Sequence, residues 1–299
     1  MGRIAAFLGV SRVPFLALPV VLVALGTAAA VVNGAPFRWG RALVALVGLV
    51  ALHVAVNVLN EVSDARTGID QLTRPTPFSG GSKTIPEGRL SPRAALLFGL
   101  AMIAVGCAAG GWFLSTVGWP LVPFLVLGAV LVLGYTDFLA RIGLGEVGAG
   151  LGLGALPVLG SALVQDGWIG PAAIAAAAPS FFLTFDLLLL NQFPDVEADR
   201  SGGRRNLVLA LGPALAAMVW AVAALLVPVT ILAAIVLGIF PGWAALGLLP
   251  SLLLARPLAW AVRGAPGEIP IPALAANVTW NLATHALLAL GLALSAFLA

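Results

Sequence analysis

The chain has 299 residues, of which 61% are hydrophobic and 9% are charged, and its formal net charge is +3. A water-soluble protein of this length needs a larger polar surface to cover its core, so the composition indicates a polytopic membrane protein. Basic residues in such a chain usually set its orientation in the bilayer, so the positive net charge gives no reason to expect a nucleic-acid partner. The single cysteine, Cys107, excludes an intramolecular disulfide.

Apolar runs of membrane-spanning length recur along the whole chain. An α-helix needs about 20 mostly apolar residues to cross a bilayer. The runs that meet this requirement cover residues 13–33, 41–60, 94–114, 120–139, 147–164, 169–190, 213–239, 243–260 and 273–298. We therefore predict an all-α polytopic membrane protein with nine transmembrane helices.

The basic residues predict how these helices are oriented. All lysines and arginines except Arg38 and Arg41 fall at the N-terminus or in the even-numbered loops and their flanks. Lys and Arg are enriched in cytoplasmic loops. We therefore predict that the N-terminus and the even-numbered loops face the cytoplasm, in a bacterial or archaeal cytoplasmic membrane.

The second predicted helix ends in a polar motif. Asn60 and Asp64 are four residues apart, so in a helix they share one face, and Glu61 and Asp70 lie close to them in sequence. The loop that follows contains prolines and glycines between residues 74 and 83, which favours a backbone that can approach an anion. Its basic residues are candidates for binding that anion: Arg66, Arg74 and Lys83.

A second motif with the same layout follows the sixth predicted helix. In a helix, Asn191, Asp195 and Asp199 lie at i, i+4 and i+8 on one face. Carboxylates stacked so closely repel one another unless a cation lies between them, and such oxygen ligands suit Mg²⁺ bound together with substrate phosphates. The arginines just beyond the motif are placed to bind those phosphates: Arg200, Arg204 and Arg205.

The two motifs also indicate an internal repeat. Asn60 and Asn191 are 131 residues apart (191 − 60), with four predicted helices between them, so both motifs are expected on the same side of the membrane. We predict a single membrane-embedded domain over residues 1–299, built from four-helix units at about 13–139 and 147–260 with an extra helix at 273–298.

Two predicted helices carry polar side chains at every fourth position, which is costly in a bilayer and points to function. The stripes are His53, Asn57 and Glu61 on the second helix, and Asn277, Asn281 and His285 on the ninth. Each stripe either lines a pocket or hydrogen-bonds neighbouring helices. The only tyrosine, Tyr135, faces the same pocket or anchors its helix at the membrane interface. For the pocket we select His53, Asn57, Tyr135 and Asn281, and we add Arg141 to the phosphate-binding residues.

These motifs resemble those of the UbiA-type intramembrane prenyltransferases. The stretch from Asn60 to Asp70 is similar to the family's first motif, with Glu61 where an Asp is more usual, and the stretch from Asn191 to Asp199 is similar to its second. The resemblance implies that two Mg²⁺-bound carboxylate clusters hold the diphosphate of a polyprenyl donor while an acceptor is alkylated. The residues assigned to catalysis on this basis are Asn60, Asp64, Asp195 and Asp199. Those assigned to the metal are Glu61, Asp64, Asp70, Asn191, Asp195 and Asp199.

The segments around Asp70 and Tyr135 most resemble the branch that prenylates 1,4-dihydroxy-2-naphthoate on the way to menaquinone. The same chemistry on 4-hydroxybenzoate, homogentisate, a lipid or a tetrapyrrole is the alternative. Two other classes stay open at this stage. A secondary transporter also carries intramembrane polar stripes, although its sites lie near the midplane, and a membrane phosphotransferase also uses clustered Asp residues and a metal.

Overall fold

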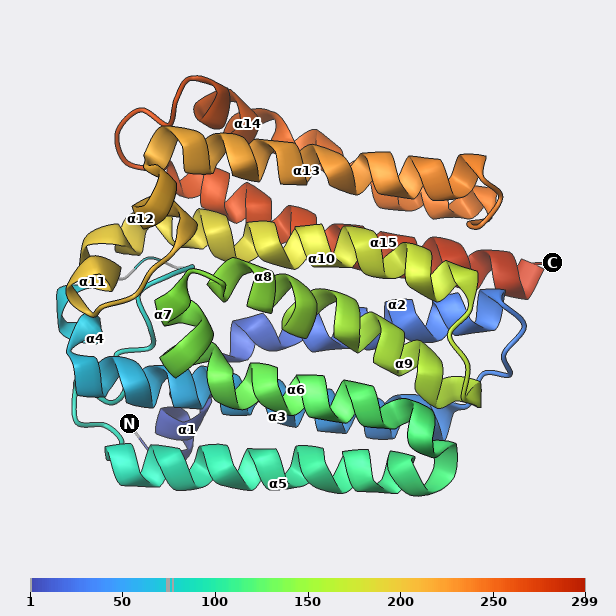
Figure 1. Ribbon diagram of the computed structural model, residues 1–299, viewed down its shortest axis with the longest axis horizontal. Helices are drawn as coiled ribbons and strands as arrows, with labels where there is room; N and C mark the ends of the chain where they lie inside the picture. The colour runs from blue at the N-terminus through green and yellow to red at the C-terminus, as the bar shows by residue number, and fades with distance from the viewer. Residues whose placement is uncertain (1, 74–75, 77, 299) are drawn as a thin grey trace.

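The structure is a computed structural model that describes residues 2–73, 76 and 78–298. Within these residues the fold is a helical bundle without β-strands. Nine of the described helical segments are long and apolar enough to span a membrane, which confirms the predicted fold class. They lie side by side along the long axis of the molecule (Figure 1).

The helices of the first half follow the predicted spans closely. In chain order they are α1 (Arg3–Ser11), α2 (Ala17–Val32), α3 (Trp39–Thr67), α4 (Ile69–Leu72), α5 (Pro92–Val117), α6 (Val122–Gly134) and α7 (Ala140–Ile142). Short 3-10 turns at Val13–Leu16 and Trp119–Leu121 precede α2 and α6, and one π-helical turn, Tyr135–Leu139, joins α6 to α7.

The second half also consists of α-helices joined by 3-10 and π-helical segments. Its helices are α8 (Gly145–Gly150), α9 (Leu156–Asp166), α10 (Pro171–Asn191), α11 (Val196–Ser201), α12 (Leu207–Leu211), α13 (Pro213–Val236), α14 (Ala255–Val262) and α15 (Ile271–Leu298). A π-helical turn, Leu151–Ala155, joins α8 to α9, and 3-10 segments at Phe193–Asp195 and Gly242–Leu254 precede α11 and α14.

The second and sixth spans extend beyond the bounds predicted from hydropathy. The sequence predicted ends at residues 60 and 190, whereas helical structure continues to Thr67 and to Ser201. Hydropathy falls at the first polar residues, but helical hydrogen bonding continues through them. Span 2 stops only at Gly68, whose φ of +78° is the left-handed conformation that ends many helices.

The spans that contain α2, α9 and α10 are the most buried of the bundle. In the most apolar 18-residue window of each, 56%, 61% and 61% of the residues are buried, compared with 17% in the span that contains α6. Small residues allow the buried helices to approach closely. A Cβ on Gly154 would lie only 2.3 Å from the backbone oxygen of Ser180 on α10.

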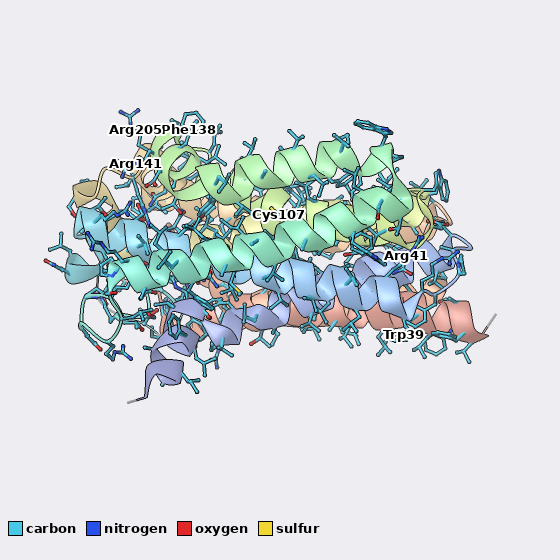
Figure 2. All side chains as sticks on the ribbon, turned by 90° about the horizontal axis from the view of Figure 1, so that it is seen from below. Trp39, Arg41, Cys107, Phe138, Arg141 and Arg205 are labelled. Atoms are coloured by element: carbon cyan, nitrogen blue, oxygen red, sulfur yellow. The ribbon has the colours of Figure 1, made fainter. Side chains whose placement is uncertain are left out.

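The short helices α4, α7, α11 and α12 gather at one end of the bundle, which also holds the N-terminus (Figure 1). We call this the motif end, because Thr67 and Ser201 finish their spans there. Figure 2 shows Arg141 and Arg205 at this end and Arg41 at the opposite end. The repeat of two four-helix units and the cytoplasmic orientation of the motif end stay predictions.

Candidate active site

The first motif is helical and buried. Asn60 and Asp64 lie in the last two turns of α3, and Gly68 then turns the chain so that Asp70 enters the short helix α4. Asp64 is 4% exposed and Asp70 is 2% exposed. Both carboxylates are therefore largely withdrawn from bulk water before any ligand binds.

The second motif is not the single uninterrupted helix that its spacing suggested. The α-helical run of α10 ends at Asn191, and a 3-10 turn leads into α11. Pro194 lies in this turn, where its missing N–H cannot support a continuous α-helix. Asn191, Asp195 and Asp199 nevertheless all line one cavity.

The ends of the two motifs meet directly. Gly202, after α11, packs on Ile69 of α4 so closely that a Cβ on Gly202 would lie 2.0 Å from the Ile69 side chain. Arg204 then reaches across the junction. Its guanidinium forms an ion pair with Asp64 of the first motif and another with Asp199 of the second, at 3.3 Å.

These residues surround a cavity of about 210 Å³ at the motif end, which we call the polar cavity. Its polar lining comes from α3, α4, α10 and α11 and from the segments that follow them: Asn57, Asn60, Asp64, Asp70, Asn191, Asp195, Asp199, Arg204, Arg205 and Asn206. The structure thus brings both predicted motifs into one site.

Arg12 also lines the polar cavity, although no sequence pattern selected it as a ligand-binding residue. Its guanidinium lies 3.3 Å from the side-chain amide of Asn60 and 3.8 Å from Oε2 of Glu61. Its backbone is left-handed, with φ at 50°, because Arg12 caps the C-terminus of α1. The turn between α1 and α2 thus places Arg12 beside the first motif.

Glu61 has a different environment from the one predicted. It is fully buried but does not line the polar cavity. Its carboxylate accepts hydrogen bonds from the Ser82 hydroxyl and from the backbone N–H of Thr84, at 3.2 Å. Glu61 thus holds the loop after α4 against α3, and its role as a metal ligand stays a prediction.

The same loop brings glycines to the cavity, as its composition suggested. Gly80 and Gly81 both line it, and both have positive φ angles. A Cβ on Gly81 would lie 2.7 Å from Oδ1 of Asp70. The backbone of this loop therefore approaches the first motif more closely than a side chain would permit.

The basic residues selected from the sequence divide into two groups. Arg204 and Arg205 line the polar cavity. The ammonium of Lys83 instead donates to the backbone oxygens of Asp70 and Thr73. Three further members do not line the cavity: Arg66 is exposed, Arg141 faces Asp137, and Arg200 pairs with Glu197. Arg74 lies outside the described residues.

Three of the four pocket residues selected from the sequence reach the polar cavity. His53 and Tyr135 line it and also line a second, apolar cavity beside it. Asn57 lines the polar cavity and donates to the backbone oxygen of Ser11 at 3.0 Å. Asn281 is fully buried on α15 and lines neither cavity, because its helix presents Val278 and Leu282 there instead.

The apolar cavity, of about 200 Å³, continues from His53 and Tyr135 toward the opposite end of the bundle. Its lining comes from α3, α5, α6, α8 and α9 and is almost free of polar groups. Representative residues are Leu52, Phe113, Phe124, Leu131 and Gly160.

The charged groups of the polar cavity shift one another's pKa values. Burial, together with the neighbouring carboxylates of Asp64 and Glu61, raises the pKa of the Asp70 carboxyl to about 6. Burial alone would lower the pKa of Arg204, but Asp64 and Asp199 outweigh this effect and raise it above its usual value. Arg204 therefore stays positively charged between the two motifs.

The described residues contain no group of three His, Cys, Asp or Glu side chains arranged to hold a metal ion, since Arg204 lies between Asp64 and Asp199. The site still offers free ligands. One buried side-chain oxygen on each of Asp70, Asn191 and Asp195 has no hydrogen-bond partner, and Mg²⁺ prefers carboxylate and carbonyl oxygens of this kind. The residues therefore fit a divalent cation that binds together with an anionic substrate.

An apolar bundle with an acidic and basic cavity at one end defines an integral, multi-pass membrane protein with a buried site for a charged ligand. Residues 17–268 match the UbiA prenyltransferase family, and the chain belongs to this family.

Several known proteins are similar to the chain. It is 29% identical over 204 residues to the 1,4-dihydroxy-2-naphthoate octaprenyltransferase of Escherichia coli. The aligned region covers 62% of this chain and 64% of that protein. It is 28% identical over 267 residues to the protein of the same name from Mycobacterium tuberculosis, and the aligned region covers 85% of this chain and 86% of that protein. The chain thus spans less than two thirds of the first relative's length and most of the second's.

Solved structures share the fold. A UbiA homolog from Aeropyrum pernix K1 superimposes with a TM-score of 0.71 at 19% identity, covering 93% of this chain and 97% of that one. A UbiA homolog from Archaeoglobus fulgidus bound to GPP and Mg²⁺ superimposes with a TM-score of 0.61 at 15% identity, covering 95% and 99%.

Proposed function

We propose that the chain transfers a polyprenyl group from a polyprenyl diphosphate to an aromatic acceptor within the membrane, with Mg²⁺ as the cofactor. The observation that carries this proposal is the polar cavity itself, in which two acidic motifs and three arginines surround one space. Such a space suits a diphosphate with its counter-ions. The apolar cavity that opens from it suits an isoprenoid chain.

The donor diphosphate binds between the guanidinium groups of Arg12, Arg204 and Arg205, which favour phosphate oxygens through paired, charge-assisted hydrogen bonds. Asn60, Asp64 and Asp70 would hold one Mg²⁺, and Asn191, Asp195 and Asp199 another. When bound, the cations neutralise the charge that develops on the departing diphosphate.

The reaction breaks the allylic C–O bond of the donor and forms a C–C bond to the acceptor ring, which regains its aromaticity by losing a proton or, for a naphthoate acceptor, its carboxyl group as CO2. The allylic carbon becomes cationic as the C–O bond breaks, so water must be kept away from it. His53 and Tyr135 lie where the polar and apolar cavities join. The Tyr135 ring is thus placed to stabilise a passing cation.

We propose 1,4-dihydroxy-2-naphthoate as the acceptor, which makes the chain a polyprenyltransferase of menaquinone biosynthesis. Two similar proteins carry this substrate in their names. His53 and Asn57 offer hydrogen-bonding groups on the membrane side of the first motif, where a hydroxyl or carboxylate of the acceptor can reach them. The motif end faces the cytoplasm in this proposal, so that a water-soluble diphosphate head group enters from that side.

The direct test uses purified protein in lipid nanodiscs with octaprenyl diphosphate, Mg²⁺ and a panel of acceptors. We expect pyrophosphate release together with an octaprenylated product of 1,4-dihydroxy-2-naphthoate that has lost its carboxyl group as CO2, detected by mass spectrometry. A product formed only from 4-hydroxybenzoate or homogentisate would correct the acceptor. Absence of prenyl transfer to every aromatic acceptor would refute the proposal.

A second test examines the apolar cavity as the site of the isoprenoid chain. A Cβ on Gly160 would have only Phe124 nearby, at 3.9 Å, so Gly160→Phe should fill the cavity without a backbone clash. We expect this variant to keep activity with geranyl diphosphate and to lose it with octaprenyl diphosphate. Gly111→Phe is the matched control, because Gly111 is exposed on α5 and lines neither cavity.

A further inference from the structure

A second group of polar side chains lies inside the bundle, apart from both cavities. The backbone of Asp186 on α10 lies against α15 at Asn277. Asn281 and Thr284 follow Asn277 along one side of α15, at helical spacing. All four side chains are fully buried, and none lines the polar or the apolar cavity. Neither the family motifs nor the proposed reaction makes use of them.

One hydrogen bond fixes the level at which the two helices meet. The side-chain nitrogen of Asn277 donates to the backbone oxygen of Asp186 at 3.1 Å. The helices are antiparallel, because α10 ends at the motif end and α15 runs away from it (Figure 1). Side chains lean toward the N-terminus of their own helix, so the Asp186 carboxylate leans away from the motif end, toward the levels of Asn281 and Thr284.

The polar atoms of this group have no partners among the described residues. Both carboxylate oxygens of Asp186, the amide oxygens of Asn277 and Asn281, the amide nitrogen of Asn281 and the hydroxyl of Thr284 form no hydrogen bond. Burying a polar group without a hydrogen bond is costly, and burying an ionised carboxylate without a counter-charge is far more so. The nearby His285 uses Nδ1 to bond the backbone oxygen of Asn281 at 2.8 Å, and its Nε2 forms no hydrogen bond with any of these atoms.

The chemistry of the unpartnered atoms indicates what would satisfy them. Four are oxygens that can only accept: two on Asp186, one on Asn277 and one on Asn281. A single proton on the carboxyl would serve one of these oxygens, whereas a metal cation takes several oxygen ligands at once. The group contains only one carboxylate, so a monovalent cation makes it neutral and a divalent cation would leave a buried positive charge.

We propose that Asp186 and the facing polar side chains of α15 form a binding site for a monovalent alkali cation, Na⁺ or K⁺. The cation joins α10 to α15 across the middle of the bundle. Asp186 lies five residues before Asn191, which is about one and a half helical turns. The cation would therefore brace the helix that carries the second motif without contacting the substrate.

The test is thermal unfolding of the purified protein without donor, acceptor or Mg²⁺, so its result does not depend on the proposed reaction. We compare NaCl, KCl and choline chloride at equal ionic strength. At a concentration about 100 times Kd, the bound cation should raise Tm by roughly 3–5 °C over choline, and the effect should saturate. The alkali ion with the lower half-saturating concentration is the one that the site prefers.

Two variants and one control locate the effect. Asp186→Asn should abolish the dependence on the alkali cation, and Asn281→Ala should raise the half-saturating concentration at least tenfold. Asp166→Asn removes an exposed carboxylate and should respond to salt as the wild type does. If Asp186→Asn fails to fold, Asn281→Ala carries the test. Equal Tm of the wild type in all three salts would overturn the proposal in favour of a protonated carboxyl, and so would an unchanged response in Asn281→Ala.

Discussion

Arg204 is the residue whose removal tests the site most directly. It supplies the positive charge between Asp64 and Asp199, which are 4% and 3% exposed, and its own side chain is 19% exposed. Arg204→Ala leaves two buried carboxylates without a counter-charge. Breaking a buried pair in this way typically costs about 3–5 kcal/mol. With about 2.1 cal/mol/K of unfolding entropy per residue, this corresponds to a Tm lower by roughly 5–8 °C for a chain of this length.

The assay is thermal unfolding in detergent, once with EDTA and once with Mg²⁺. We expect the variant to be destabilised in EDTA and largely restored by Mg²⁺, because the cation replaces the missing positive charge between the motifs. The Tm of Arg204→Lys in EDTA should lie between those of Arg204→Ala and the wild type, since lysine keeps the positive charge but lacks the planar guanidinium that binds two oxygens at once. Arg200→Ala is the control and should leave Tm unchanged, because the ion pair that Arg200 forms among the described residues is with the exposed Glu197. An Arg204→Ala variant that unfolds at the wild-type temperature in EDTA would refute the reasoning.

Three further predictions follow from the site. Asp195→Asn should abolish turnover and leave Tm near the wild-type value, which separates catalysis from folding; near-normal activity of the purified variant would contradict its assignment. Arg12→Gln should weaken donor binding roughly 10- to 100-fold, as expected for lost hydrogen bonds to a charged group, and an unchanged donor affinity would limit Arg12 to holding Asn60. Gly202→Val should cost about 1–3 kcal/mol of stability through overpacking against Ile69, and adding Ile69→Ala should recover part of the loss; equal Tm values for Gly202→Val and the wild type would argue against the close contact.

The spans and the two motifs could be predicted because lipid and helix geometry leave few options. A run of apolar residues must cross the bilayer as a helix, and Asn60 and Asp64 share a face wherever that helix continues. The even number of spans between the motifs required them to meet on one side. The structure has both motifs lining one cavity, as this reasoning expected.

Other parts of the site depend on backbone turns and side-chain choices that sequence spacing does not reveal. Arg12 reaches the cavity through a left-handed residue conformation, which no local pattern signalled. Glu61 is adjacent to Asn60 in sequence, yet it does not line the polar cavity and instead binds the loop at Ser82 and Thr84. Lys83 has the charge to bind a phosphate, but its ammonium donates to the backbone oxygens of Asp70 and Thr73 instead.

The Asp64–Arg204 pair also has a consequence for how the protein is made. Its partners are 140 residues apart in the chain, and a ribosome that adds 5–20 residues per second needs roughly 7–28 s to cover that distance. During this interval Asp64 has been synthesised, whereas Arg204, the arginine that forms an ion pair with it, has not. The Asp64 carboxylate therefore lacks this counter-charge until the chain has been extended past the sixth span. The contact between Gly202 and Ile69 can form only at that point as well.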